Sequence, residues 1–347
     1  MKNITNNIHF CMVMLVIFCG SADAQSHLET IVQSPSSPAK PLVVYAVLDH
    51  FAKKVGFEFE RLYGTKVRVV PMRGSGATLT RLKYEKKRPK ADVWFGGSMG
   101  AHAQGAFEGL VSAYKPAGAS QLNRKFSNPL GDHRVTGLYA GILCLVVNTH
   151  LLEQKGIRIP QSWQDLTDPV YKGLIGLKKP TISGTAYTML ATVMQIMGEE
   201  QGLSYLKALN SNVSSYSKMI RSYMDKDKIA IIVGFVHEEI PSNTPPVNQR
   251  RRVVIPSEGT GYEIGGLSLV YNAPQSVLAK KFIDLAVSMK MQAREAKTSN
   301  RIPTHTRVTR HPYYGDLSQF KLIDYDFAWA GKNRQRLVKL WQQQVIR

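Results

Sequence analysis

Apolar positions along the chain alternate between short unbroken runs and helical spacing. Residues 42–47 and 91–95 are apolar runs, and residues 66–71 alternate apolar and polar side chains, so all three segments predict strands. Residues 49–63 and 79–87 carry apolar side chains every three or four positions, which predicts two helices. This strand–helix–strand–helix order is typical of an α/β layer built on a parallel sheet.

The same alternation continues through the rest of the chain. The ranges expected to form strands are 143–147, 174–177, 229–233, 253–255 and 267–271, and those expected to form helices are 187–197 and 274–291. Two such units, connected more than once, predict an α/β fold of two lobes with a hinged cleft between them. The lobes are expected to comprise residues 41–140 with 266–312, and residues 141–265 with 313–347.

The N-terminus has the pattern of an export signal. Lys2 precedes an apolar run at residues 10–18, and Ala22-Asp23-Ala24 supplies small residues around a cleavage site. The run is too short to span a membrane. We therefore expect a signal peptide over residues 1–24 with cleavage near Ala24, followed by a polar, Pro/Ser-rich flexible leader over residues 25–40.

Cysteine usage bears on how the mature protein is held together. Cys11 and Cys19 leave with the signal peptide, and Cys144 remains inside an apolar run. We expect Cys144 to be a buried core thiol, so the exported protein is held by its core without a disulfide. The remaining chain of about 320 residues is long enough for two domains.

The chain carries a formal net charge of +20 at pH 7, which favours anionic partners. The densest basic runs, at residues 86–88 and 250–252, are not interleaved with aromatic side chains, so we expect no nucleic-acid binding. The histidines lack the spacing of a zinc site, and no nucleophile stands in a catalytic sequence context. We therefore expect neither an enzyme nor a bound metal or cofactor.

Three short loops of Gly, Ser and Thr, at residues 74–78, 96–100 and 183–188, each precede a stretch that predicts a helix. Helix N-termini present free backbone N–H groups and partial positive charge, so they bind anions. Small residues let a ligand approach the backbone, and hydroxyls add hydrogen-bond donors. The residues expected to contact an anion are Ser75, Gly76, Ser98, Ser183, Gly184, Thr185 and Ala186.

Polar side chains also follow the apolar strand expected at residues 229–233. His237 and Glu238 come just after this strand, and Glu258 lies in a glycine-spaced turn at residues 258–263. Groups at the carboxyl end of a strand are placed to face a cleft, and carboxylate with imidazole can hydrogen-bond the hydroxyls of a polyol. We expect His237, Glu238 and Glu258 to do so. The simpler alternatives are a solvated loop after the strand and, for residues 258–263, a hinge turn whose glycines serve only backbone geometry.

These segments carry a family resemblance. Residues 183–186, 235–238 and 258–265, together with 91–97 and 162–166, resemble the periplasmic solute-binding proteins of ABC importers. The relevant relatives are the group that binds ferric ions or hexose phosphates, and the resemblance covers the chain from about Pro41 on. It implies a periplasmic, two-lobed, type II binding protein that delivers a small anionic solute to an inner-membrane ABC permease. We expect it to be a monomer.

The resemblance also separates the two branches of this group. Ferric-binding members carry adjacent tyrosines where this chain has Gly234 and Phe235, and Tyr313-Tyr314 lies outside the matching segment. The branch implied is therefore the hexose-phosphate one, although this chain has Glu238 where that branch has Asp. The alternatives are ferric iron with a synergistic anion and, third, a phosphonate or another small anion.

Overall fold

The computed structural model describes residues 40–240 and 250–346. Residues from Pro41 on form one compact unit. The expected signal peptide, and the leader apart from its last residue, lie outside the described residues. No helix in the described part of the chain is both long and apolar enough to cross a membrane.

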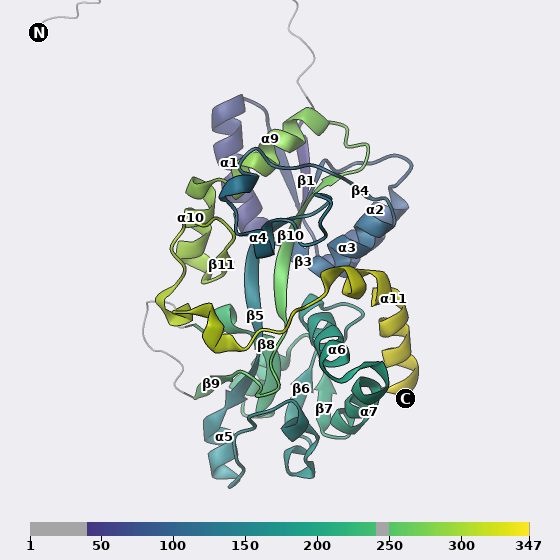
Figure 1. The fold of residues 1–347 in the computed structure, drawn as a ribbon, viewed down its shortest axis with the longest axis vertical. Helices are drawn as coiled ribbons and strands as arrows, with labels where there is room; N and C mark the ends of the chain where they lie inside the picture. Colours follow the sequence, from purple (N-terminus) through teal and green to yellow (C-terminus); the bar gives the residue numbers. More distant parts are fainter. Residues whose placement is uncertain (1–39, 241–249, 347) are drawn as a thin grey trace, which may run out of the picture. The chain divides into compact units, whose positions relative to one another are not determined.

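Strands from the whole described chain join in one mixed sheet (Figure 1). Its main path runs β2-β1-β3-β10-β5-β8-β6-β7, while β4, β9 and β11 pair at its sides. The strands are β1 (Leu42–Ala46), β2 (Val67–Pro71), β3 (Val93–Ser98), β4 (Val111–Ser112), β5 (Thr136–Asn148), β6 (Ile175–Leu177), β7 (Val213–Tyr216), β8 (Ile231–Phe235), β9 (Arg251–Val254), β10 (Tyr262–Val270) and β11 (Ile302–Pro303).

Two long strands, β5 and β10, connect the ends of this sheet. β10 pairs with β3 on one side and with β5 on the other, and β5 continues to β8. All three of these pairings are antiparallel, whereas β1 with β2 and β3, and β6 with β7 and β8, are parallel. The parallel sheet expected for the first unit is therefore present in β1, β2 and β3. The centre of the sheet is antiparallel, which apolar runs alone do not indicate.

Helices cover both faces of the sheet, and α11 packs on α3 and α6. The helices are α1 (Asp49–Tyr63), α2 (Ser75–Tyr84), α3 (Met99–Phe107), α4 (Arg124–Ser127), α5 (Thr149–Gln154), α6 (Gly184–Met197), α7 (Glu199–Asn210), α8 (Ile220–Asp225), α9 (Ser276–Val287), α10 (Met289–Ser299) and α11 (Phe327–Gln344). Short 3₁₀ turns link them, among them η2 (Gln164–Thr167) and η4 (Val236–Glu238).

One predicted helix and the three predicted Gly/Ser/Thr loops differ from the structure. The single helix expected over residues 274–291 is two helices, because Ser288 is extended (φ −61°, ψ 150°) and its hydroxyl accepts the N–H of Met291 as the N-cap of α10. The loop expected at residues 96–100 is the end of β3 and the start of α3, and the loops expected at residues 74–78 and 183–188 lie mostly in the first turns of α2 and α6. Cys144 is fully buried in the core, as predicted.

The buried carboxyl group of Asp92 joins three segments: β1, the residue just before β3, and the segment that enters α9. Asp92 is 1% exposed and accepts hydrogen bonds from the N–H groups of Val43 (2.8 Å) and Gln275 (2.6 Å). Burial raises the pKa of Asp92, and the two backbone donors oppose that rise. Asp92 therefore ties β1 to the segment that enters α9.

Replacing Asp92 with Ala should lower the free energy of unfolding by about 2–4 kcal/mol, because two backbone N–H groups lose their acceptor inside the protein. Urea denaturation measures the change. Glu153→Ala removes an exposed carboxylate from α5 and serves as the control, with an expected change within about 0.5 kcal/mol. Equal stabilities for the two variants would contradict this role of Asp92.

Candidate ligand-binding site

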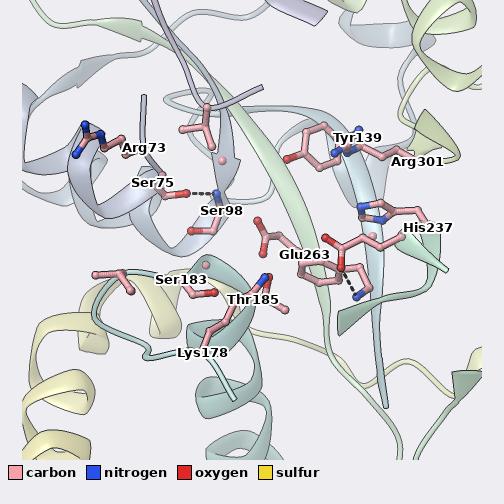
Figure 2. Close-up of a pocket in the computed structure, with 18 of the residues that line it drawn as sticks. Arg73, Ser75, Ser98, Tyr139, Lys178, Ser183, Thr185, His237, Glu263 and Arg301 are labelled. Atoms are coloured by element: carbon pink, nitrogen blue, oxygen red, sulfur yellow. Dashed lines mark hydrogen bonds between the residues drawn. The ribbon is translucent and has the colours of Figure 1, made fainter. Parts of the chain in front are cut away.

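A pocket of about 350 Å³ lies where the loop before α2, the β3–α3 junction, the N-terminus of α6 and the segment after β8 meet (Figure 2). Strands β5 and β10 contribute residues to its wall. It is lined by Val47, Arg73, Gly74, Ser75, Gly97, Ser98, Tyr139, Gly141, Lys178, Ile182, Ser183, Gly184, Thr185, Lys218, Phe235, His237, Glu238, Glu263 and Arg301. All three predicted Gly/Ser/Thr loops thus reach one cavity.

One side of the pocket, which we call the serine side, is formed by Ser75, Ser98, Ser183, Thr185 and Lys178 (Figure 2). The Ser75 hydroxyl accepts the N–H of Ser98 at 2.8 Å, and the buried Ser98 hydroxyl has no partner within the described residues. Ser183 caps α6. The serine side therefore combines free hydroxyl donors with a lysine and the N-terminus of a helix, all of which favour an anion.

Close packing explains why α6 begins with glycine. A Cβ at position 184 would lie 2.8 Å from the Cβ of Ser98, so a larger residue would push the helix away from β3. The Ser183 hydroxyl accepts the N–H of Ala186 at 3.3 Å. Ala186 and Gly76 lie in the first turns of α6 and α2 but outside the pocket lining, so the structure does not support their predicted contact with a ligand.

The cationic side chains of the pocket were not among the predicted site residues. Arg73, Lys178, Lys218 and Arg301 line it, and the first three form no ion pair with any described residue. Arg73 directly precedes the first glycine loop, and Lys178 directly follows β6, so their positions beside predicted elements were the available signal. Lys218 and Arg301 come from segments without a recognisable pattern. Together they make the pocket strongly cationic.

The opposite side, which we call the histidine side, is formed by Tyr139, His237, Glu238 and Arg301; Figure 2 labels these residues except Glu238. The carboxyl group of Glu263 lies between the two sides, with its Oε1 3.6 Å from where a Cβ of Gly184 would lie. The imidazole of His237 stacks on Phe235, with 5.5 Å between ring centroids. Its Nδ1 is buried without a partner among the described residues. Burial, reinforced by Arg301, lowers the pKa of His237 to about 3, so the imidazole is neutral.

The two carboxyl groups that line the pocket differ in their partners. Glu238 accepts from the guanidinium of Arg221 at 2.6 Å, and although burial opposes ionisation, Arg221 holds its pKa below the ordinary value. Glu263 accepts from the Thr188 hydroxyl at 3.2 Å, and burial raises its pKa to about 8. Glu238 was predicted; Glu263 was overlooked inside the same turn sequence that drew attention to Glu258.

The prediction that Glu258 contacts the ligand does not fit the structure, which places this residue outside the pocket lining. Its carboxylate accepts the backbone N–H groups of Trp163 and Gln164, each at 3.0 Å, and so caps the turn that leads into η2. The expectation that Glu258 orients ligand hydroxyls is therefore not supported. The nearby strand residue Glu263 lines the pocket instead, because only residues from Tyr262 on enter β10.

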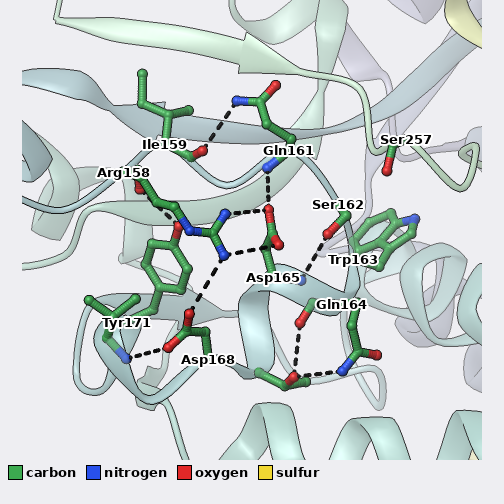
Figure 3. Close-up of polar contacts among 12 residues, drawn as sticks. Arg158, Ile159, Gln161, Ser162, Trp163, Gln164, Asp165, Asp168, Tyr171 and Ser257 are labelled. Carbon is green, nitrogen blue, oxygen red and sulfur yellow. Dashed lines mark hydrogen bonds and ion pairs between the residues drawn. The ribbon is translucent and has the colours of Figure 1, made fainter.

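The capped turn is a structural cluster of its own (Figure 3). Arg158 forms two hydrogen bonds with Asp165, at 2.9 and 3.1 Å, and these hold the pKa of Asp165 at about 2. The Ser162 hydroxyl accepts the N–H of Asp165. Residues 162–166, one of the segments that carried the family resemblance, thus serve this local fold.

Three of the seven buried side-chain atoms without a hydrogen-bond partner in the described chain belong to pocket residues. They are Ser98 Oγ, His237 Nδ1 and Arg301 Nε. Buried polar groups in proteins are nearly always paired, so a cluster of unpaired ones in a pocket indicates a ligand site. No group of three or more His, Cys, Asp and Glu side chains placed to hold a metal ion is found among residues 40–240 and 250–346.

Replacing Glu258 with Ala should lower the free energy of unfolding by about 1–2 kcal/mol, because two N–H groups of the turn lose their acceptor. Glu258→Gln keeps an acceptor oxygen and should lose less. Urea denaturation of the three proteins measures the order. Wild-type stability of Glu258→Ala would show that the cap contributes nothing.

Known proteins resemble the chain over most of its length. An uncharacterized protein of Haemophilus influenzae is 39% identical over 284 residues, which are 78% of this chain and 81% of that protein. The periplasmic binding protein AfuA from Actinobacillus pleuropneumoniae, solved with exogenous fructose 6-phosphate bound, is 34% identical with a TM-score of 0.79. The alignment covers 88% of this chain and 98% of AfuA.

Other solved structures support the fold class. The periplasmic binding protein P5PA is 30% identical with a TM-score of 0.80, covering 88% of this chain and 99% of P5PA. The apo ferric ion-binding protein A of Pasteurella haemolytica is 17% identical with a TM-score of 0.75, and the alignment covers 88% of this chain and 98% of that protein. At this identity the likeness shows the fold alone. The two-lobed periplasmic binding protein fold is thus confirmed. Residues 89–329 match the family of bacterial extracellular solute-binding proteins, and the chain belongs to this family.

Proposed function

We propose that this protein is a periplasmic binding protein that captures a hexose phosphate and delivers it to an inner-membrane ABC permease. The observation that carries the proposal is the division of one pocket into two chemically different sides. The serine side offers hydroxyl, ammonium and helix N-terminal groups, which suit a phosphate. The histidine side offers a neutral imidazole and carboxyl oxygens, which suit the hydroxyls of a sugar.

The charge balance of the pocket fits a ligand with two negative charges. Four cationic side chains line it: Arg73, Lys178, Lys218 and Arg301. The ionised carboxylate of Glu238 also lines the pocket, but its charge is neutralised by Arg221, which lies outside the lining. Arg301 pairs with Glu295 at 3.4 Å, so the positive charge of Arg73, Lys178 and Lys218 remains available to a phosphate group. A likeness of 34% to a structure with bound fructose 6-phosphate supports the same class of ligand.

Ferric iron, the alternative ligand, finds little support in this pocket. Hard Fe³⁺ prefers anionic oxygen ligands such as phenolate. The tyrosine among the lining residues is Tyr139, and burial raises its pKa to about 12, which disfavours the phenolate. Tyr314 is buried and donates to the carbonyl of Asn300, outside the pocket. A phosphonate would satisfy the serine side alone and would leave the histidine side without a role.

Ligand titration of the purified wild type tests the proposal. Glucose 6-phosphate should bind at least tenfold more tightly than inorganic phosphate, because only the sugar phosphate also contacts the histidine side. Ferric citrate should give no visible charge-transfer band. Native mass spectrometry of the protein as purified provides a second measurement, with a retained hexose phosphate expected. Retained iron, or equal affinity for phosphate and every sugar phosphate, would refute the proposal.

The adjacent pair Lys178 and Lys179 provides a matched test of the serine side. Lys178 lines the pocket, whereas Lys179 is exposed and outside the lining. Lys178→Met should weaken glucose 6-phosphate on the order of tenfold, because it removes a charge-assisted hydrogen bond. Lys179→Met removes the same charge one residue away and should leave the affinity within about twofold. Calorimetry that finds the two variants alike would exclude Lys178 as a phosphate ligand.

A further inference from the structure

Glu263 is a buried acid without a cation of its own. Glu263 as a whole is 7% exposed, and its Oε2 accepts one hydrogen bond, from the Thr188 hydroxyl. Within the described residues it forms no ion pair. It nevertheless lines the ligand pocket, so one of its oxygens is available to whatever the pocket holds. A buried carboxylate without a cation is costly, and the group avoids that cost by keeping its proton.

The neighbouring cations are committed to other acids. Arg221 lies between Glu238 (2.6 Å) and Glu239, contacting both carboxylates. Arg301 pairs with Glu295 at 3.4 Å and also lies 5.0 Å from the ring centroid of Tyr139. Neither guanidinium is therefore free to neutralise Glu263.

The groups that face Glu263 act in opposite directions. Glu238 on η4 raises its pKa, and Arg301, before β11, lowers it by less than burial raises it. His237 is neutral, and the phenols of Tyr139 and Tyr325 have pKa values raised by burial. Because two neighbouring carboxylates repel each other, the one that holds a guanidinium, Glu238, ionises and the other, Glu263, stays neutral.

We propose that Glu263 binds the ligand as the neutral acid, with its carboxyl O–H donating a hydrogen bond to an oxygen of the hexose phosphate. This inference rests on the proposed function. It gives the carboxyl groups of the pocket two different hydrogen-bonding roles: Glu238 accepts, and Glu263 donates. It also makes affinity depend on pH, since above about pH 8 the proton leaves, the donor is lost and a second carboxylate faces the ligand.

Titration of glucose 6-phosphate at pH 7, 8, 9 and 9.5 into wild type and Glu263→Gln tests the donor role. The amide keeps a donor and never ionises, so Glu263→Gln should bind within about threefold of wild type at pH 7. The ratio of wild-type to variant affinity should fall about tenfold per pH unit above pH 8, as expected for the loss of one proton. Comparison with the variant cancels the titration of all other groups and of the phosphate.

Two binding results would overturn the proposal. A loss of more than tenfold in Glu263→Gln at pH 7 would mean that the ligand needs a carboxylate at this position. A constant affinity ratio from pH 7 to 9.5 would mean that Glu263 does not change its charge in this range. Glu263→Ala, which removes the donor and the acceptor together, should weaken binding at every pH tested.

Thermal unfolding without ligand measures the protonation independently. In the unfolded chain a glutamate titrates near pH 4.3, whereas folded Glu263 keeps its proton to about pH 8. The stability of wild type relative to Glu263→Gln should therefore be greatest at pH 4, fall as the pH rises towards 8, and then stay level. A difference that does not change with pH would overturn the neutral acid. The expected profile without binding of any sugar phosphate to wild type would instead refute the proposed function and, with it, the donor role.

Discussion

The antiparallel pairing of β5 and β10 is the constraint on which the pocket depends. In this register Glu263 lies opposite Gly141, and Gly265 lies opposite Tyr139, so these four residues share one face of the two strands. A Cβ at position 141 would lie 2.7 Å from Cε1 of His237. The missing side chain therefore makes room for the imidazole beside Glu263. A shift of the pairing by one residue would turn the pocket side chain of the shifted strand, Tyr139 of β5 or Glu263 of β10, to the opposite face.

Much of the fold could be predicted from local patterns. The helix expected over residues 49–63 agrees with α1, because its apolar spacing is regular and Gly64 adopts the left-handed conformation that ends it. The position of each Gly/Ser/Thr loop after a strand could also be predicted. The convergence of the loops could not be predicted from strand ends, because β6 runs antiparallel to β3 across β10, β5 and β8. The strand direction at the centre could not, because it depends on pairing between distant segments.

The site was predicted less completely than the fold, for a physical reason. Hydroxyl and glycine residues at helix starts carry a local signature, but a lysine or arginine looks the same on any surface. Lys178 and Lys179 are adjacent and identical in type, yet only Lys178 lines the pocket. Glu258 and Glu263 differ in the same way: the first caps a turn, and the second enters β10. Which acid faces the ligand is decided by where the strand begins.

The excess positive charge of the whole chain acts together with the pocket. Four pocket cations are a small part of 45 lysine and arginine residues, which outnumber 25 acidic residues. Most of this charge cannot contact a ligand, but it creates a field that attracts anions over about a Debye length, roughly 8 Å at physiological ionic strength. Such a field attracts any anion equally, so it raises the rate of encounter without selecting a ligand. In the proposed function, selection is left to the histidine side, where His237 is neutral and Glu238 already holds Arg221, so net charge contributes little and hydrogen-bond geometry decides.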